Sequence, residues 1–281
     1  MRALLLGLLL ACTACGRDAD VRSPGLPAAP GAPTPSTSTV LFGAVSDTAF
    51  RPLSGARVEI VDGPQAGSFT TSAADGRFSI TFTSSDTVTV RATKDGYASA
   101  TMNVRPPSGI FLSFYLSPPA QVNIAGTYTL TFVADSACAG LPEALRTRTY
   151  TAAIAPSPYR PGDTLFEVTL SGAPFIGTYN GFEVGVAGNY LAFTIYNNFD
   201  EGEGVVEEIG PSTYLEVVGT ASASVGSDGV SAISIPFSGN FGLCVGSAPY
   251  SAGSLYRCYL RAPVSLAECR SQNHRLILTP R

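Results

Sequence analysis

The sequence predicts an all-β protein with two folded modules. Its 281 residues are enough for about two domains of ordinary size. The chain contains 29 glycines and 21 prolines, which suit short strands joined by tight turns. No stretch carries an apolar stripe with the period of a helix, whereas many short segments alternate apolar and polar residues.

The charge pattern argues against nucleic-acid binding. Charged residues make up 14% of the chain, and the formal net charge is −4. Lys94 is the only lysine among the 17 basic residues, and the arginines are scattered. Because no basic run is available to neutralise phosphates, we expect no nucleic-acid partner.

Residues 1–15 have the layout of an export signal. In "MRALLLGLLLACTACG", Arg2 precedes an apolar run that is too short to span a bilayer, which needs about 20 residues. The box "LLAC", ending at Cys12, resembles the lipidation box of bacterial lipoproteins, and "ACG" at Cys15 is a rival. The resemblance implies a membrane partner through a lipid anchor on Cys12, with Cys15 as the alternative. An ordinary cleaved signal with incidental cysteines is the other interpretation.

Residues 16–38 are predicted to form a Pro-rich, disordered linker. The stretch "SPGLPAAPGAPTPSTS" mixes prolines with small residues, which cannot form a core and favour an extended spacer. An anchor followed by a spacer holds folded modules away from a membrane. We therefore expect the bacterial cell envelope, with the protein anchored in the outer membrane and facing the periplasm or the surface. Disulfides persist in that compartment.

Residues 39–118 are predicted to form a seven-stranded β-sandwich. In "GRFSITFTS", Phe78, Ile80 and Phe82 point one way while Ser and Thr point the other, as in a half-buried strand. The preceding Asp75-Gly76 pair favours a hairpin turn because glycine tolerates positive φ.

These segments also resemble a known family. "GAVSDTAFRPLSGARVEIVDG", "DGRFSI" and the turn "KDGY" are similar to the carboxypeptidase regulatory-like domain. The resemblance implies a transthyretin-like sandwich that serves as an accessory module. Some relatives share a carbohydrate-binding-like fold, which permits glycan contact.

Residues 120–281 are predicted to form an antiparallel meander of 8–10 strands. The strand candidates include "GTYTLTFVA", "TLFEVTLSG", "NYLAFTIYN", "GSLYRCYL" and, at the end, "NHRLILTP", with short turns between successive strands. We favour a closed, lipocalin-like barrel over a sandwich because closure leaves no exposed edge. The region is also similar to a poorly characterised C-terminal β-domain of bacterial surface proteins, a resemblance that implies no activity.

Four cysteines remain after removal of the signal, and they allow three pairings. If the last strand pairs antiparallel with the first strand of this region, and Leu276 lies opposite Leu130, Cys269 falls beside Cys138. The other two cysteines flank a short hairpin or loop. The predicted disulfides are therefore Cys138–Cys269 and Cys244–Cys258.

His274 is the only histidine, and we expect a structural role for it, near Phe132 on the inner face or at the rim. A catalytic or metal-binding role is the alternative. The chain has no Gly-x-Ser-x-Gly elbow, no set of zinc ligands and no phosphate-binding loop. We expect no catalytic residues and no cofactor, and a hydrolase is the last-ranked hypothesis.

One acidic cluster, "NFDEGEGVVEE", is expected in a solvated turn. It contains Asp200, Glu201, Glu203, Glu207 and Glu208. The alternative is a weak Ca²⁺ site built from the oxygens of the first three.

These observations favour a non-catalytic lipoprotein of the cell envelope whose two β-modules bind a carbohydrate or an envelope protein. The alternative is a lipocalin-like carrier that holds a small apolar ligand inside the barrel. Tyr128, Leu130, Phe132 and Phe193 would then line the pocket. The sequence leaves the oligomeric state open.

Overall fold

The protein is all-β. Its computed structural model describes residues 38–106, 109, 111–158, 164–176, 180–196, 204–226, 231–246 and 264–281. Within these ranges the one helical element is the 3₁₀ turn η1 (Glu143–Leu145). None of the described helical structure is long and apolar enough to cross a membrane.

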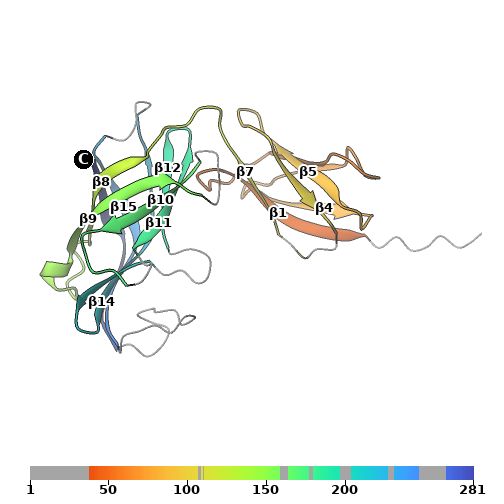
Figure 1. Ribbon diagram of the computed structural model, residues 1–281. Coiled ribbons are helices and arrows are strands. Elements are labelled where there is room, and N and C mark those ends of the chain that lie inside the picture. Colours follow the sequence, from red (N-terminus) through yellow and green to blue (C-terminus); the bar gives the residue numbers. More distant parts are fainter. Residues whose placement is uncertain are drawn as a thin grey trace, which may run out of the picture. The chain divides into compact units, whose positions relative to one another are not determined.

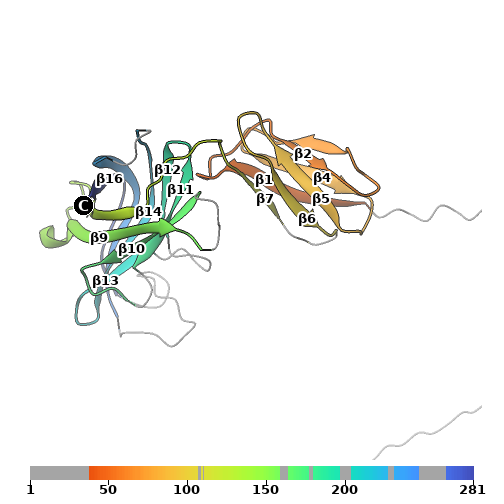
Figure 2. The ribbon, with the colours of Figure 1, turned by 45° about the horizontal axis from the view of Figure 1, so that its top comes forward.

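The first seven strands form two sheets that enclose one core (Figures 1 and 2). One sheet has the order β4-β1-β7, in which β1 pairs antiparallel with β4 and parallel with β7. The other has the order β3-β2-β5-β6. The strands are β1 (Thr39–Asp47), β2 (Arg57–Ile60), β3 (Phe69–Thr71), β4 (Arg77–Phe82), β5 (Val88–Thr93), β6 (Ala100–Val104) and β7 (Leu112–Leu116). The predicted seven-stranded sandwich is confirmed.

The alternation of apolar and polar residues along the strands explains how this core forms. Phe78, Ile80 and Phe82 are buried along β4 while the residues between them are exposed. The turn before β4 contains Gly76 at φ +77°, a conformation that L side chains rarely adopt. Its amide donates to the carbonyl of Ala73 over 2.9 Å, which closes the turn.

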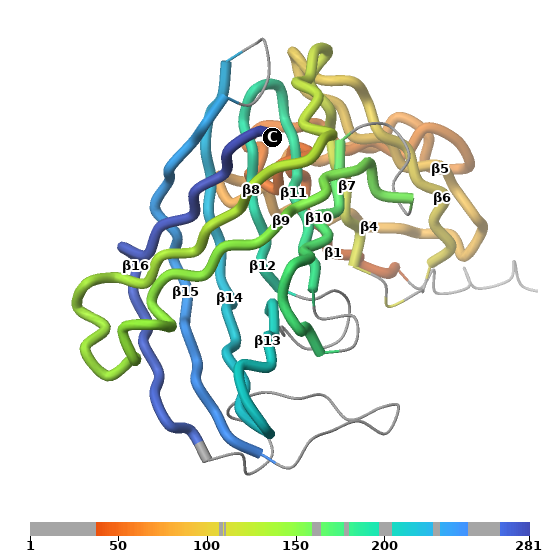
Figure 3. The backbone as a smooth tube through the Cα atoms, turned by 60° about the vertical axis from the view of Figure 1, so that its left-hand side comes forward, coloured from red at the N-terminus to blue at the C-terminus, as the bar shows by residue number. Residues whose placement is uncertain are grey.

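The remaining nine strands form one sheet that closes on itself (Figure 3). Its order is β12-β11-β10-β9-β8-β16-β15-β14-β13, and a β12–β14 pairing completes an eight-stranded barrel. The strands are β8 (Gly126–Val133), β9 (Thr147–Pro156), β10 (Leu165–Ser171), β11 (Gly181–Ala187), β12 (Tyr190–Ile195), β13 (Val205–Gly210), β14 (Thr213–Ser224), β15 (Ile233–Val245) and β16 (Val264–Pro280). The predicted meander and closed barrel are confirmed.

Strand β14 has two partners along its length. Its second half, Gly219–Ser224, pairs with β12, whereas its first half pairs with β13. At the change of partner, Gly219 lies opposite Gly239 of β15. A Cβ on Gly239 would come within 2.2 Å of the Val218 carbonyl oxygen and 2.6 Å of the Phe237 ring. Glycine is required there because the strands and the ring approach so closely.

Aromatic rings fill the barrel interior. The ring of Phe132 lies 5.8 Å from Phe237, 6.3 Å from Tyr150 and 6.4 Å from Phe182, measured between centroids. Since these residues come from β8, β9, β11 and β15, their contacts cross the barrel. Tyr128, Leu130, Phe132 and Phe193, the predicted interior residues, are all buried in this single core.

The first and last strands of the barrel pair antiparallel, but the predicted register is wrong by two residues. Leu276 pairs with Phe132, and Leu278 pairs with Leu130. The same side chains still face inward, because a two-residue shift in a strand preserves the face.

One strand boundary and one whole strand also differ from the prediction. β16 begins at Val264, well before the predicted "NHRLILTP" segment. β13 was expected to be a solvated turn. A further predicted strand, "GSLYRCYL", lies outside the described residues.

Candidate functional site

Cys138 and Cys269 form the predicted disulfide, with Cα atoms 5.6 Å apart. Cys138 lies in the turn after β8, where its amide donates to the carbonyl of Asp135, and Cys269 lies on β16. The bond therefore ties the turn after the first barrel strand to the last strand. Both sulfurs are oxidised and cannot serve as thiolate ligands.

His274 is fully buried beside this disulfide. Its Nδ1 accepts a hydrogen bond of 2.9 Å from the amide of Asp135, and its ring lies 4.8 Å from that of Phe241. Burial lowers the pKa of His274, because the charged imidazolium is poorly solvated there, whereas nearby backbone groups of Cys269 and Gly239 oppose the shift.

The surroundings of His274 favour structure over chemistry. The potential ligand atoms of Cys138, Cys269 and His274 lie within 4.8 Å of one another, which is close enough for a metal ion. In the oxidised protein, however, the sulfurs bond to each other and the Nδ1 lone pair accepts the Asp135 amide. The arrangement fits the structural role expected from the sequence.

Several predicted site residues lie outside the described residues. They are Cys12, Cys15, Asp200, Glu201, Glu203 and Cys258. Cys244 is described; it is buried on β15 and is disulfide-bonded.

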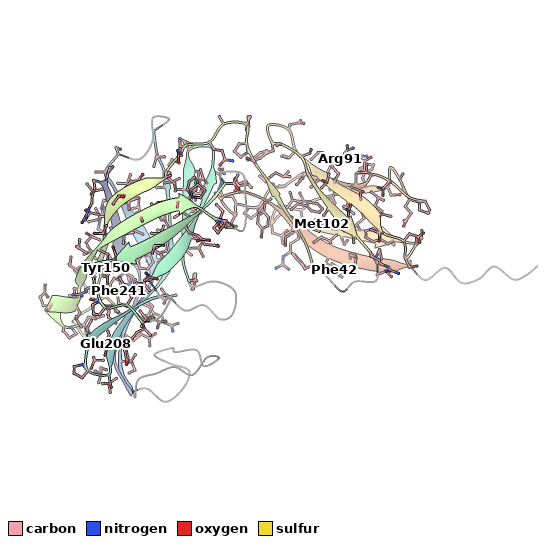
Figure 4. All side chains as sticks on the ribbon, in the orientation of Figure 1. Phe42, Arg91, Met102, Tyr150, Glu208 and Phe241 are labelled. Atoms are coloured by element: carbon pink, nitrogen blue, oxygen red, sulfur yellow. A yellow bond between two sulfur atoms is a disulfide. The ribbon has the colours of Figure 1, made fainter. Side chains whose placement is uncertain are left out.

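Glu207 corrects the prediction that the whole acidic cluster is solvated. It lies on β13 and is 3% exposed. Its carboxylate accepts hydrogen bonds from Arg148 Nε over 2.9 Å and from the Tyr150 hydroxyl over 2.8 Å, and Arg148 adds a second ion-pair contact. Tyr150 and Glu208, the neighbour of Glu207, are labelled in Figure 4.

The charge of Glu207 and the burial of this cluster change the pKa values of Arg148 and Tyr150. Glu207 raises the pKa of Arg148 through its hydrogen bonds, and burial together with the Glu207 charge raises that of Tyr150. Arg148 and Tyr150 are therefore held in their protonated forms at neutral pH. The sequence carried a partial signal: Arg148 and Tyr150 alternate in "RTRTYT" and so share one face of β9.

The outer wall of the barrel carries a depression of about 470 Å³. Val218, Asn240 and Arg270 form a cross-strand row on β14, β15 and β16. Tyr196 extends this row, because it follows Ile195, which pairs with Gly219. The other lining residues are mostly small or polar: Thr220, Ser238, Gly239, Ser271 and Gln272.

Asn240 is the unusual member of this row. It is only 5% exposed, yet neither its Oδ1 nor its Nδ2 has a hydrogen-bond partner. Leaving a buried polar group unpaired costs about 1–3 kcal/mol, so such groups are rare in folded proteins. Asn240 therefore lines the depression with an unused donor and an unused acceptor, both of them buried.

Sequence reasoning missed the depression because its residues are scattered between positions 196 and 272. They become neighbours only through the pairing of β12, β14, β15 and β16.

The fold defines a two-module β-protein, with a sandwich followed by a closed barrel. Residues 40–117 match the carboxypeptidase regulatory-like domain, which confirms the predicted family of the first module. No curated protein matches the chain at a significant level. The barrel lies outside the matched residues.

Proposed function

We propose that this protein is a non-catalytic lipoprotein of the bacterial cell envelope whose β-modules bind a carbohydrate or an envelope protein. The regulatory-like domain at residues 40–117 supports the proposal, because such domains are accessory modules. The signal-like N-terminus, the Pro-rich spacer and the Cys138–Cys269 disulfide suit an anchored protein of an oxidising compartment.

The observation that carries the proposal is the contrast between the inside and the outside of the barrel. Phe132, Tyr150, Phe182 and Phe237 fill the interior with contacting rings, where a lipocalin-like carrier needs an apolar pocket. The outer wall has a polar depression with an unpaired Asn240 carboxamide. Binding at the surface is therefore favoured over transport of an apolar ligand.

The environment of His274 supports the non-catalytic part of the proposal. A general base needs a nitrogen lone pair directed at a substrate proton. The Nδ1 lone pair instead accepts the amide of Asp135, which places the proton of the neutral ring on the buried Nε2.

The test uses the full chain, solubilised from membranes in mild detergent. It is applied to a printed array of defined oligosaccharides and, separately, used as bait for proteins of an envelope extract, with hydrolysis products followed in the array eluates. Saturable binding without turnover supports the proposal. Hydrolysis of a bound glycan, or failure to bind in both formats, overturns it.

A further inference from the structure

We infer that the depression on the barrel wall is a binding site for a neutral saccharide, with the Asn240 carboxamide as its central polar contact. This inference rests on the proposed binding function and names the partner of one surface. Tyr196, Val218, Asn240 and Arg270 supply the row of side chains that would meet the sugar.

The chemistry of Asn240 selects the ligand. Its carboxamide presents two N–H donors on Nδ2 and an acceptor on Oδ1, side by side, and both atoms are unpaired. Two neighbouring hydroxyls of a sugar ring match this pattern, because one can accept from Nδ2 while the other donates to Oδ1. An apolar ligand would leave both atoms unsatisfied, at the cost of a buried polar group without a partner.

The rest of the lining suits a hydroxyl-rich, uncharged ligand. Tyr196 is 38% exposed at one end of the row, where its ring can pack on the C–H face of a sugar. Thr220, Ser238 and Gln272 add exposed hydroxyl and amide groups. At the other end, Arg270 donates from Nε to Glu268 over 2.7 Å, so that a carboxylate offsets the guanidinium charge.

The closed wall argues against an extended peptide. Peptides commonly bind sheets by adding a strand to an unpaired edge. The floor of the depression lies on β14 and β15, and β14 has partners on both sides, as does β15 between β14 and β16. Ligand recognition here must therefore come from side chains. The volume of about 470 Å³ falls within the usual range for small-ligand sites, about 300–1,000 Å³.

Asn240→Leu separates recognition from stability. Leucine has a similar size but cannot form hydrogen bonds, so the unpaired buried amide disappears and thermal stability should be unchanged or higher. Saccharide binding by the full chain should fall at least about tenfold. The matched control is Thr169→Leu, a polar-to-leucine change at an exposed position of β10, which should leave binding unchanged.

Tyr196 provides an independent pair of variants at an exposed position. Tyr196→Ala should weaken saccharide binding about tenfold, whereas Tyr196→Phe keeps the ring and should retain most of the affinity. Binding is measured first on an array of defined neutral and acidic oligosaccharides, and then by calorimetry with the neutral saccharide that gives the strongest array signal.

The outcomes decide the inference separately from the proposed function. Binding of a neutral saccharide that is lost in both Asn240→Leu and Tyr196→Ala supports the site. Saccharide binding that survives both changes overturns it and places recognition elsewhere. A full chain that captures an envelope protein but binds no neutral saccharide overturns the inference while leaving the proposed binding function in place.

Discussion

At the scale of single residues, the burial of His274 favours a structural role over a catalytic one. His274 lies on β16, where it pairs with Phe237 of β15 in the sheet register, and its ring lies 4.8 Å from that of Phe241 at a tilt of 54°. Its Nδ1 fixes the amide of Asp135, and Asp135 in turn accepts a hydrogen bond of 2.5 Å from Ser271. The ring thus helps to hold the turn after β8 against β16.

His274 should make stability depend on pH. Its pKa is lowered in the folded protein, so the unfolded chain takes up the proton first as the pH falls below about 6.5. The free energy of unfolding should be at its full value above that pH and decrease below it. Urea unfolding at pH 7.5 and 5.5 measures the difference, and His274→Gln should abolish most of it because the chain has no other histidine. An unchanged pH dependence in the variant would refute the assignment.

Glu207 should contribute to the free energy of unfolding, because it is buried beside the cationic side chain of Arg148. Glu207→Gln keeps the shape but leaves Arg148 without its anionic partner, and we expect a loss of about 2 kcal/mol after allowance for the partial exposure of Arg148. Glu208→Gln on the same strand is the matched control and should change stability by less than about 0.5 kcal/mol. Equal effects of the two variants in urea unfolding would contradict a special role for Glu207.

At the scale of elements, alternation made most strands predictable. "GRFSITF" and "GTYTLTFV" alternate because one face of each strand meets a core. The first half of β16 was not predicted, because residues 265–270 are largely exposed and, among the described strands, pair only with β15. β13 was not predicted as a strand, because its glutamates indicated a solvent-exposed turn. Only the fold shows that Arg148 and Tyr150 of β9 form hydrogen bonds with Glu207.

The two-residue error in the predicted register of β8 and β16 has a similar cause. Tyr128, Leu130 and Phe132 are equally good apolar partners for the last strand, so patterning selects the face but not which of them lies opposite Leu276. The depression could not be predicted from the sequence for a related reason. Its row of residues depends on the register of four strands at once.

The Cys138–Cys269 disulfide should stabilise the barrel, because it links the turn after β8 to β16. It links residues 131 positions apart, and the chain-entropy estimate for a loop of that length is about 5 kcal/mol. We expect Cys138→Ser with Cys269→Ser to lower the free energy of unfolding by about 3–5 kcal/mol, measured with urea without reductant. Wild type in reductant should lose at least as much stability, because reductant also opens the disulfide of Cys244. A double variant as stable as the oxidised wild type would show that the bond does not constrain the unfolded chain.

At the scale of the whole molecule, sequence order matches the proposed role. The proposed lipidation box and proposed spacer precede a regulatory-like sandwich and a barrel with a polar depression on its wall. An extended proline-rich chain gains about 3.1 Å per residue, so a spacer of the proposed length would separate the modules from the proposed anchor by several nanometres. Under the proposed function, that separation would let the modules meet partners beyond the membrane surface.

The proposed lipid anchor can be tested without knowledge of the partner. Stable attachment requires more than one acyl chain, which a diacylglyceryl and N-acyl modification of Cys12 would supply. Replacing both Cys12 and Cys15 by Ala should therefore move the protein from the detergent phase to the aqueous phase in cloud-point partitioning. The single changes Cys12→Ala and Cys15→Ala identify the modified residue, since only one of them should release the protein. If the double variant partitions like wild type, neither cysteine carries the anchor, and the modules reach their partner without one.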